Sequence, residues 1–311
     1  MARPLSWLVV LTLVLGVVAC GGESNGTGSS TTAKPALRYQ FEKGATLRYL
    51  NTTENKTEGG MMNFNQHQEQ GLLWEVQEVD AEGTATIHIT YESVKARMES
   101  PQGVMEFDST KDEGSGGDPF GQTMSAFVGK TVAMKVDPFG KVLEVDGFSA
   151  ILEPALKDNP MADFVRGTFN DEAMGQMMQN SMALLPDTEP EVGDSWSQAY
   201  SAPAGMLGTM SVDVKNSIDS IQEVAGDKLA KILILGTFDM SAIQAPEDTG
   251  ENPMAAMLSQ MKVSDGKVDG EVVFDMSHGR VETQRTTVTM VMEMMGQQMK
   301  STATTTVKRV D

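Results

Sequence analysis

Residues 84–91 read Thr-Ala-Thr-Ile-His-Ile-Thr-Tyr, and this strict alternation of polar and apolar side chains decides the fold class. Successive side chains of a β-strand point to opposite faces, so a period of two indicates a strand with one buried and one solvated face. The same pattern recurs at residues 132–136 and 288–292. The sequence therefore predicts a mainly β protein built from antiparallel strands.

Turns rich in Asp and Gly separate the predicted strands, and several landmarks occur twice in the same order. They are Glu42-Lys-Gly44 and Glu191-Val-Gly193 before an aromatic strand, turns at Gly83 and Gly226, helix starts at Asp118-Pro119 and Asn252-Pro253, and turns at Phe139-Gly140 and His278-Gly279. Chance spacing of glycine turns is one interpretation, and a degenerate duplication is the favoured one. It predicts two similar β-rich halves, residues 37–152 and 190–311, forming a curved sheet or half-barrel.

A helical connector, residues 153–189, is expected between these halves. Asn170 is a good N-cap, and the residues after it place methionines on one helical face before Pro186. These methionines are Met174, Met177, Met178 and Met182. Shorter helices are expected after Asp118-Pro119 and Asn252-Pro253, so the β protein should carry a few short Met-rich helices. The Asn/Thr-rich stretches at Asn51 and Asn55 are interpreted as loops.

The N-terminus resembles that of a bacterial lipoprotein precursor. A basic start precedes the unbroken apolar run of residues 5–18, which is too short to span a bilayer, so residues 1–19 are expected to be a signal peptide. Val17-Val18-Ala19-Cys20 resembles a lipobox, which implies cleavage before Cys20 and its acylation. Residues 20–36 are rich in Gly, Ser and Thr and are expected to be a flexible tether. The residue after Cys20 is Gly21, whereas an aspartate at this position is the signal for retention in the inner membrane. A location at the outer membrane or the periplasmic face is therefore favoured.

Composition excludes several classes of partner and cofactor. The net charge of −19, from 24 Lys+Arg against 43 Asp+Glu, argues against nucleic acid as a partner. One cysteine excludes an intrachain disulfide, and three scattered histidines do not predict a metal centre. The sequence has no nucleophile elbow, HExxH, Walker A or GxGxxG motif, so neither enzymatic activity nor a cofactor is expected.

Methionine is unusually frequent, at 24 of 311 residues. Thioethers are soft ligands for Cu(I), which makes Met-based copper binding a remote alternative. Methionine also fills irregular cores and adaptable apolar surfaces, and the helical methionines have core spacing. No histidine flanks the clusters, so packing is favoured over copper.

Three segments and the lipobox resemble an uncharacterised bacterial lipoprotein family, domain of unknown function 6263. The segments are Leu37-Arg-Tyr-Gln-Phe-Glu-Lys-Gly44, Val79-Asp-Ala-Glu-Gly-Thr-Ala85 and Val136-Asp-Pro-Phe-Gly-Lys-Val142. The resemblance covers most of the chain after the signal peptide, but its motifs are turns and strands. It implies a secreted β-rich lipoprotein and brings no activity.

The favoured function is a non-enzymatic cell-envelope lipoprotein, a binding or structural module held to the membrane by acylated Cys20, with an apolar ligand or an envelope protein as partner. The alternative is a carrier of an apolar ligand, a lipid or acyl chain, in a cavity covered by the Met-rich helices. Its candidate contact residues are Met174, Met177, Met178 and Met182.

Replacing Cys20 by Ser tests the anchor. Without the thiol no acyl chain can be attached, so Cys20→Ser should abolish incorporation of an alkyne-labelled fatty acid and leave an uncleaved or mis-cleaved precursor. Equal labelling of the variant and the unaltered protein would refute lipidation at this residue.

Overall fold

A computed structural model describes residues 37–59, 63–101, 103–111, 125–156, 166, 170–171, 174–175, 178–179, 182, 185–203, 209–239, 262–294 and 296–311. The expected signal peptide, Cys20 and the tether lie outside the described residues. So do Met177 and the helix starts expected after Asp118-Pro119 and Asn252-Pro253. None of the helices in the described part of the chain is long and apolar enough to cross a membrane.

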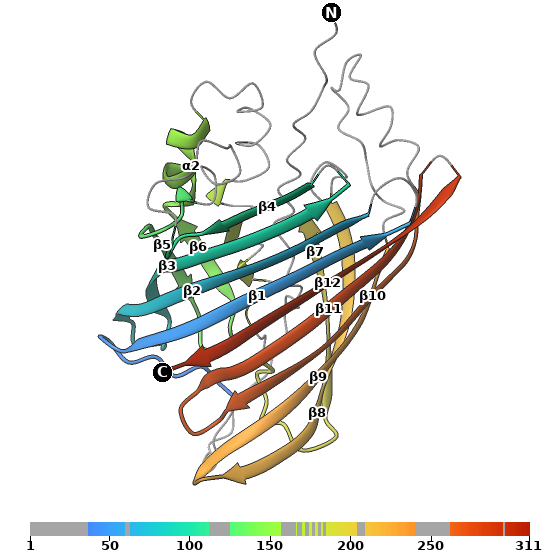
Figure 1. Cartoon of the computed structure of the whole chain (residues 1–311). Helices are drawn as coiled ribbons and strands as arrows, with labels where there is room; N and C mark the ends of the chain where they lie inside the picture. The colour runs from blue at the N-terminus through green and yellow to red at the C-terminus, as the bar shows by residue number, and fades with distance from the viewer. Residues whose placement is uncertain are drawn as a thin grey trace, which may run out of the picture.

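The described strands form a single antiparallel sheet of twelve strands, which confirms the predicted fold class. Its order is β6-β5-β3-β2-β1-β12-β11-β10-β9-β8-β7, and β4 pairs with β3 beside this path. The strand bounds are β1 Thr46–Glu58, β2 Phe64–Val79, β3 Ala85–Ser100, β4 Gly103–Asp108, β5 Thr131–Val136, β6 Val142–Asp146, β7 Ser195–Pro203, β8 Thr209–Val224, β9 Asp227–Asp239, β10 Lys262–Asp275, β11 Arg280–Met294 and β12 Gln297–Val310. The sheet is curved, and its two ends turn back behind β1 and β12 without closing on each other (Figure 1).

Both halves of the chain have the same strand order. Along the sheet, β1, β2, β3, β5 and β6 are neighbours in sequence order, and so are β7 to β12. The first half places β4 beside this path, and the second half has one strand more along it. The turns at Gly83 and Gly226 join the second and third strands of each half, and those at Gly140 and Gly279 join the strands that follow. A duplication predicts this order, although common ancestry of the halves stays a prediction. The first strand of one half and the last of the other, β1 and β12, pair from Arg48↔Val310 to Glu58↔Lys300.

The helices differ from those expected. The helix with defined bounds is α2, Phe148–Leu156, which contains no methionine and begins inside the predicted first half. Its N-terminal amide at Ser149 donates to Asp171 Oδ1 at 2.9 Å. The capping side chain therefore comes from a distant segment, and Pro154 weakens the local helical signal. The sequence predicted helix only from residue 153, in the connector, and missed the start of α2.

The segment after Asn170 is helical where it is described. Residues 171, 174, 175, 178 and 179 are in helical conformation. The amide of Met174 donates to the Asn170 carbonyl at 2.9 Å, and that of Met182 to the Met178 carbonyl at 3.2 Å. The bonds join residues four apart, as an α-helix requires, and agree with the helix predicted after Asn170.

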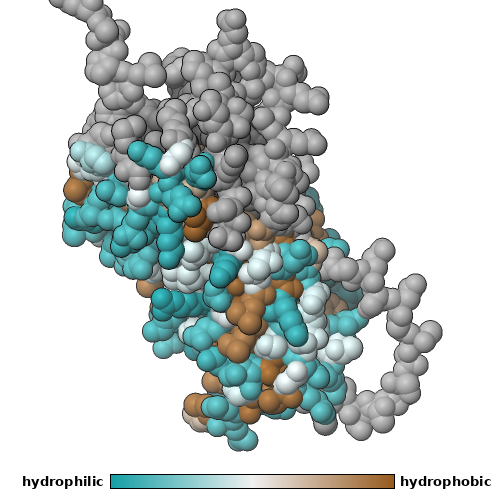
Figure 2. Space-filling model, turned by 90° about the vertical axis from the view of Figure 1, so that its right-hand side faces the viewer, coloured by the Kyte–Doolittle hydropathy of each residue, from teal (hydrophilic) through white to brown (hydrophobic). Residues whose placement is uncertain are grey.

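The convex face of the sheet is solvated. Threonines and charged residues alternate along it, with ion pairs such as Lys231–Glu271 at 3.1 Å. Thr287 and Thr304 form a hydroxyl hydrogen bond of 3.1 Å across β11 and β12. Figure 2 shows the right-hand side of the molecule, where apolar patches are interrupted by hydrophilic residues. Exposed ion pairs contribute little to stability, so the opposite, concave face supplies the packing.

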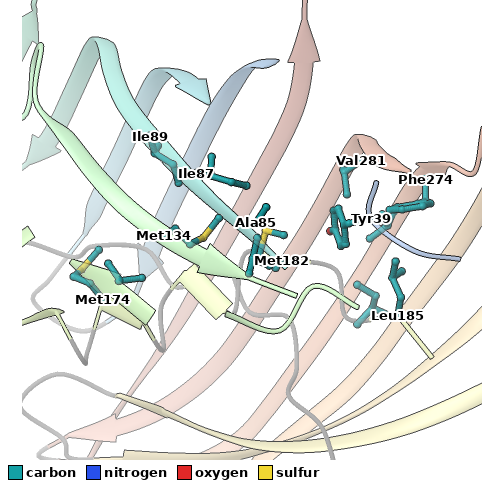
Figure 3. Close-up of a cluster of buried hydrophobic side chains, with 14 of the residues drawn as sticks. Tyr39, Ala85, Ile87, Ile89, Met134, Met174, Met182, Leu185, Phe274 and Val281 are labelled. Atoms are coloured by element: carbon teal, nitrogen blue, oxygen red, sulfur yellow. The ribbon is translucent and has the colours of Figure 1, made fainter. Parts of the chain in front are cut away.

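A short segment before β1 ties the two halves together. We call residues 37–41 the strap. The amide of Tyr39 donates to the Pro138 carbonyl at 2.8 Å, and that of Gln40 donates to the Gly279 carbonyl at 3.0 Å. These carbonyls belong to the β5–β6 and β10–β11 turns, which lie in different halves. The ring of Tyr39 also packs edge-on against Phe274, with centroids 5.3 Å apart, as Figure 3 shows.

Gly279 permits this close approach. Its φ is +61°, and a Cβ would lie 2.5 Å from the Gln40 amide nitrogen. Gly279→Ala should therefore destabilise the protein by more than the about 1–2 kcal/mol that a left-handed residue costs, because the strap must also move. The midpoint of urea denaturation measures this change.

Gly296→Ala is the matched control, because Gly296 has a φ of +74° and a Cβ there would meet nothing within 4 Å. Equal losses in the two variants would show that the strap contributes nothing measurable.

Candidate functional site

The concave face is apolar at one end of the sheet, where the strap and the hairpin turns lie. Inward side chains of β3, β5, β9 and β10 form one buried cluster there with Leu37 and Tyr39. Figure 3 shows Ile87, Ile89 and Met134 in this cluster beside Met174 and Met182. We call this region the closed end, since its packed side chains fill the space inside the curved sheet.

The predicted Met-rich helix belongs to the closed end. Met174 is 4% exposed and Met182 is 3% exposed in the main cluster, while Met178 is half-buried against it. Met177, the fourth candidate, lies outside the described residues. The positions found are those that packing predicts, and binding of a ligand by these methionines stays a prediction.

A buried glutamine fastens this helix to the β5–β6 hairpin. Gln179 Oε1 accepts a hydrogen bond from the Val142 amide at 2.6 Å, and Nε2 donates to the Gly140 carbonyl at 3.0 Å. Further on, the Leu185 amide donates to the Phe139 carbonyl at 3.0 Å. Because the amide satisfies two backbone groups of one turn, the helix is held in a fixed place on the sheet.

The middle of the concave face is polar instead. We define the polar band as a group of inward-facing polar residues near the middle of the four central strands. They are Asn51, Thr53 and Asn55 of β1, Gln66, Gln68 and Gln70 of β2, Thr286 of β11, and Thr305 of β12. All are uncharged, and the sheet register places them side by side on the face that carries Tyr49 and Val288.

Several buried atoms of the polar band have no hydrogen-bond partner within the part of the chain that the structure describes. They are Asn51 Oδ1, Asn55 Nδ2, Gln66 Oε1 and Thr286 Oγ1. Leaving a buried polar group unpaired costs about 1–3 kcal/mol, and most buried polar groups in native proteins are paired. An accumulation of such atoms in one place therefore marks a candidate binding site. Sequence reasoning missed it because it assigned Asn51 and Asn55 to loops, whereas both lie in β1.

A charged group lies between the band and the hairpin turns. Glu282 pairs with Arg309 at 2.8 Å and with Arg280 at 3.0 Å. The hydrogen bond that Arg309 donates to Glu282 raises the pKa of Arg309. Tyr49 donates its hydroxyl to the Val281 carbonyl at 3.3 Å, and burial raises its pKa above the ordinary value. The tyrosine therefore stays neutral. Glu282 is balanced by the two arginines, which also pair with Asp275 and Asp311, so this group supplies neither a phenolate nor an unpaired charge.

Buried Tyr91 lies on the same face, at the closed end. Burial raises the pKa of Tyr91 to about 12. Its hydroxyl is therefore also protonated at neutral pH and is no candidate base.

One group of potential metal ligands occurs among the described residues. Ligand atoms of Asp227, Asp275 and His278 lie within 4.8 Å of one another. Asp275 is 1% exposed, and its Oδ1 accepts hydrogen bonds from the amides of Ser277 and His278, while Oδ2 meets His278 Nδ1 at 2.6 Å. The guanidinium of Arg280 lies 3.6 Å away, where it competes with any cation. The arrangement therefore shapes the β10–β11 turn.

A histidine of β2 lies on the convex face. His67 lies in β2 beside Glu69, with Nε2 3.3 Å from Glu69 Oε1 and nearly half of its side chain exposed. Its neighbours Gln66 and Gln68 point to the opposite, concave face by strand alternation. Within residues 63–70, the histidine thus faces solvent and the glutamines are part of the polar band.

Comparison with known proteins identifies a family and distant structures. The sequence profile of a family of unknown function, DUF6263, matches residues 82–281. No curated protein matches the sequence significantly.

Among solved structures, lipovitellin aligns with a TM-score of 0.45 at 11% identity over 88% of this chain, which spans only 26% of the lipovitellin chain. The hypothetical lipoprotein YmcC from Escherichia coli aligns with a TM-score of 0.25 at 9% identity over 81% of this chain and 85% of its own. DynF from Micromonospora chersina aligns with a TM-score of 0.21 at 6% identity, over 94% of this chain and 93% of its own. At these scores the likeness says nothing about ligand or activity.

The buried methionines provide a test of fixed packing. Met182→Ala should cost about 2–5 kcal/mol of unfolding free energy, as expected when a large buried side chain is truncated, whereas Met178→Ala at the half-buried position should cost less. Met182→Lys should cost more than Met182→Ala, because an unpaired charge would be buried. Denaturant midpoints measure all three. If Met182→Lys were as stable as the unaltered protein, the helix would be a mobile cover rather than part of the core.

Proposed function

Because the chain belongs to the family of unknown function DUF6263, its geometry has to suggest its role, and we propose that it is a non-enzymatic binding protein of the cell envelope. Acylated Cys20 holds it to a membrane, at the periplasmic face or the outer membrane. The concave face of the sheet is its binding surface, and its partner is an apolar or amphiphilic ligand.

The observation that carries this proposal is the contrast along the concave face. The closed end is filled by its own side chains, whereas the middle presents buried polar atoms without partners. Packing for stability alone favours paired or apolar groups at such positions. A surface that leaves them unpaired is suited to receive a group from outside the chain.

The absence of enzymatic activity is part of the proposal. Catalytic groups work from a site that substrate can reach, with a nucleophile or base whose partners leave it available. The cluster of Asp227, Asp275 and His278 uses its polar atoms within a turn. Tyr49 and Tyr91 are kept neutral by burial, which supports binding rather than proton transfer.

A carrier of a lipid or acyl chain is the more specific form of this function. Its support is the apolar material beside the polar band. Val94, Ala96 and Met98 of β3 form a second buried cluster with Phe107, and register places them next to the three glutamines of β2. An amphiphile could place its polar part on the band and its chain along these side chains. The methionines at the closed end are buried among apolar side chains, which favours a lipid carrier over a copper-binding protein.

Native mass spectrometry tests the proposed function. The chain from residue 20 onward carries Cys20→Ala, so that it is not acylated, and is exported behind a cleavable signal peptide without a lipobox. It is purified from a bacterial periplasm without detergent. A non-covalent adduct of lipid mass should accompany the folded protein and disappear on denaturation. Absence of any adduct, together with no binding of an added single-chain amphiphile, would contradict the proposal.

A further inference from the structure

The unpaired atoms of the polar band lie close together in the register of the sheet. Asn55 of β1 stands directly opposite Gln66 of β2, and Asn51 stands opposite Gln70. On the other side of β1, Thr53 faces Thr305, which in turn faces Thr286. The unpaired atoms therefore come from β2, β1 and β11, with β12 lying between the last two, and Asn55 and Thr286 are 8% and 2% exposed.

Other polar residues on the same face do have partners. Asn216 Nδ2 donates to Gln198 Oε1 at 3.0 Å on β8 and β7. Thr53 and Thr305 share a hydroxyl hydrogen bond of 3.5 Å within the band itself. Since inward amides and hydroxyls of this sheet can pair with each other, the unpaired atoms at Asn51, Asn55, Gln66 and Thr286 form a distinct local feature.

The unpaired atoms define the chemistry of a fitting ligand. Asn51 Oδ1 and Gln66 Oε1 accept hydrogen bonds, Asn55 Nδ2 donates them, and the Thr286 hydroxyl does either. No member of the band is charged, so a phosphate, carboxylate or ammonium group would lose its hydration without an opposite charge in return. A hydroxyl group both donates and accepts, so a group bearing several hydroxyls matches this mixture.

An aromatic side chain next to the band suits the same ligand. Trp74 of β2 leaves its buried Nε1 without a hydrogen-bond partner. Its ring packs against Tyr49, with centroids 5.0 Å apart, on the closed-end side of the band. An indole N–H needs an acceptor when it is buried, and a hydroxyl oxygen provides one.

We propose that the polar band binds the hydroxyl groups of an uncharged sugar or polyol. The site comprises Asn51, Asn55, Gln66 and Thr286, with Trp74 at its edge. The sugar comes either free or as the headgroup of a glycolipid whose chain lies against the apolar cluster of Val94, Ala96 and Met98. This inference rests on the proposed binding function and specifies the chemical class of its ligand.

The experiment compares three probes by isothermal titration calorimetry on the unacylated chain from residue 20 with Cys20→Ala. They are decyl maltoside and decylphosphocholine below their critical micelle concentrations, and maltose. The two amphiphiles share a chain length and differ in headgroup. The unaltered band should bind decyl maltoside at least about tenfold more tightly than decylphosphocholine, and binding of maltose identifies the free sugar as sufficient.

Near-isosteric apolar substitutions remove the hydrogen bonds with little change of shape. The triple variant Asn55→Leu, Gln66→Met, Thr286→Val should lose about tenfold or more in affinity for decyl maltoside and keep its affinity for decylphosphocholine. Its ligand-free thermal midpoint should equal or exceed that of the parent, because unpaired buried polar atoms have been replaced. The matched control, Thr287→Val with Thr304→Val on the convex face of the same region, should leave both affinities unchanged.

Each result separates the sugar site from the proposed function. Equal affinity for the two amphiphiles, or a sugar preference that survives in the triple variant, would overturn the sugar site while leaving a binding protein. Failure of all three probes to bind would overturn both. A triple variant with a lowered ligand-free midpoint would contradict the claim that these atoms are unpaired in the empty protein.

Discussion

The pairing of β1 with β12 is the interaction on which the rest of the structure depends. It joins residues at the two ends of the described chain, from Arg48↔Val310 to Glu58↔Lys300, and makes one sheet from two halves. Closing so long a loop costs conformational entropy, which the ladder hydrogen bonds and the packing beneath them must offset. The strap adds a second connection, because Tyr39 and Gln40 bond to turns of different halves. Without this pairing neither the continuous concave face nor the polar band would exist.

The polar band lies across the line where the halves meet. Asn51 and Asn55 are on β1, and Thr305 and Thr286 follow on β12 and β11. Each unpaired buried atom opposes folding by about 1–3 kcal/mol, while a whole domain is stable by only about 5–15 kcal/mol. The closed end, with its apolar side chains and its fastened helix, supplies the packing that lets the protein fold despite this cost. The fold thus separates stability at one end of the concave face from the proposed binding site in its middle.

Local patterns in the sequence were sufficient for much of the fold. The alternation at residues 84–91 became β3, and the Asp/Gly turns became the hairpins at Gly83, Gly140, Gly226 and Gly279. The helix after Asn170 was also recognisable from its methionine spacing. Features that depend on distant residues could not be recognised from the sequence. Helix α2 is capped by Asp171, and the strap forms its hydrogen bonds only when both halves have folded. The polar band was missed for a different reason. Strand prediction relies on an apolar inner face, and β1 has amides there, so its inward residues Asn51 and Asn55 were assigned to loops. Failures of local rules of this kind are expected at functional sites.

The side-chain amides of the polar band allow the most direct test of this account. Two-dimensional NMR of protein labelled with ¹⁵N at asparagine and glutamine observes Asn55 and Gln66 on the concave face and Asn65, which lies between the inward positions and points to the convex face. The account predicts that adding decyl maltoside shifts the Asn55 and Gln66 amide resonances and slows their hydrogen exchange, while those of Asn65 stay unchanged. Unchanged Asn55 and Gln66 resonances at saturating ligand, or equal shifts at Asn65, would contradict the central claim that the concave face receives its ligand at the polar band.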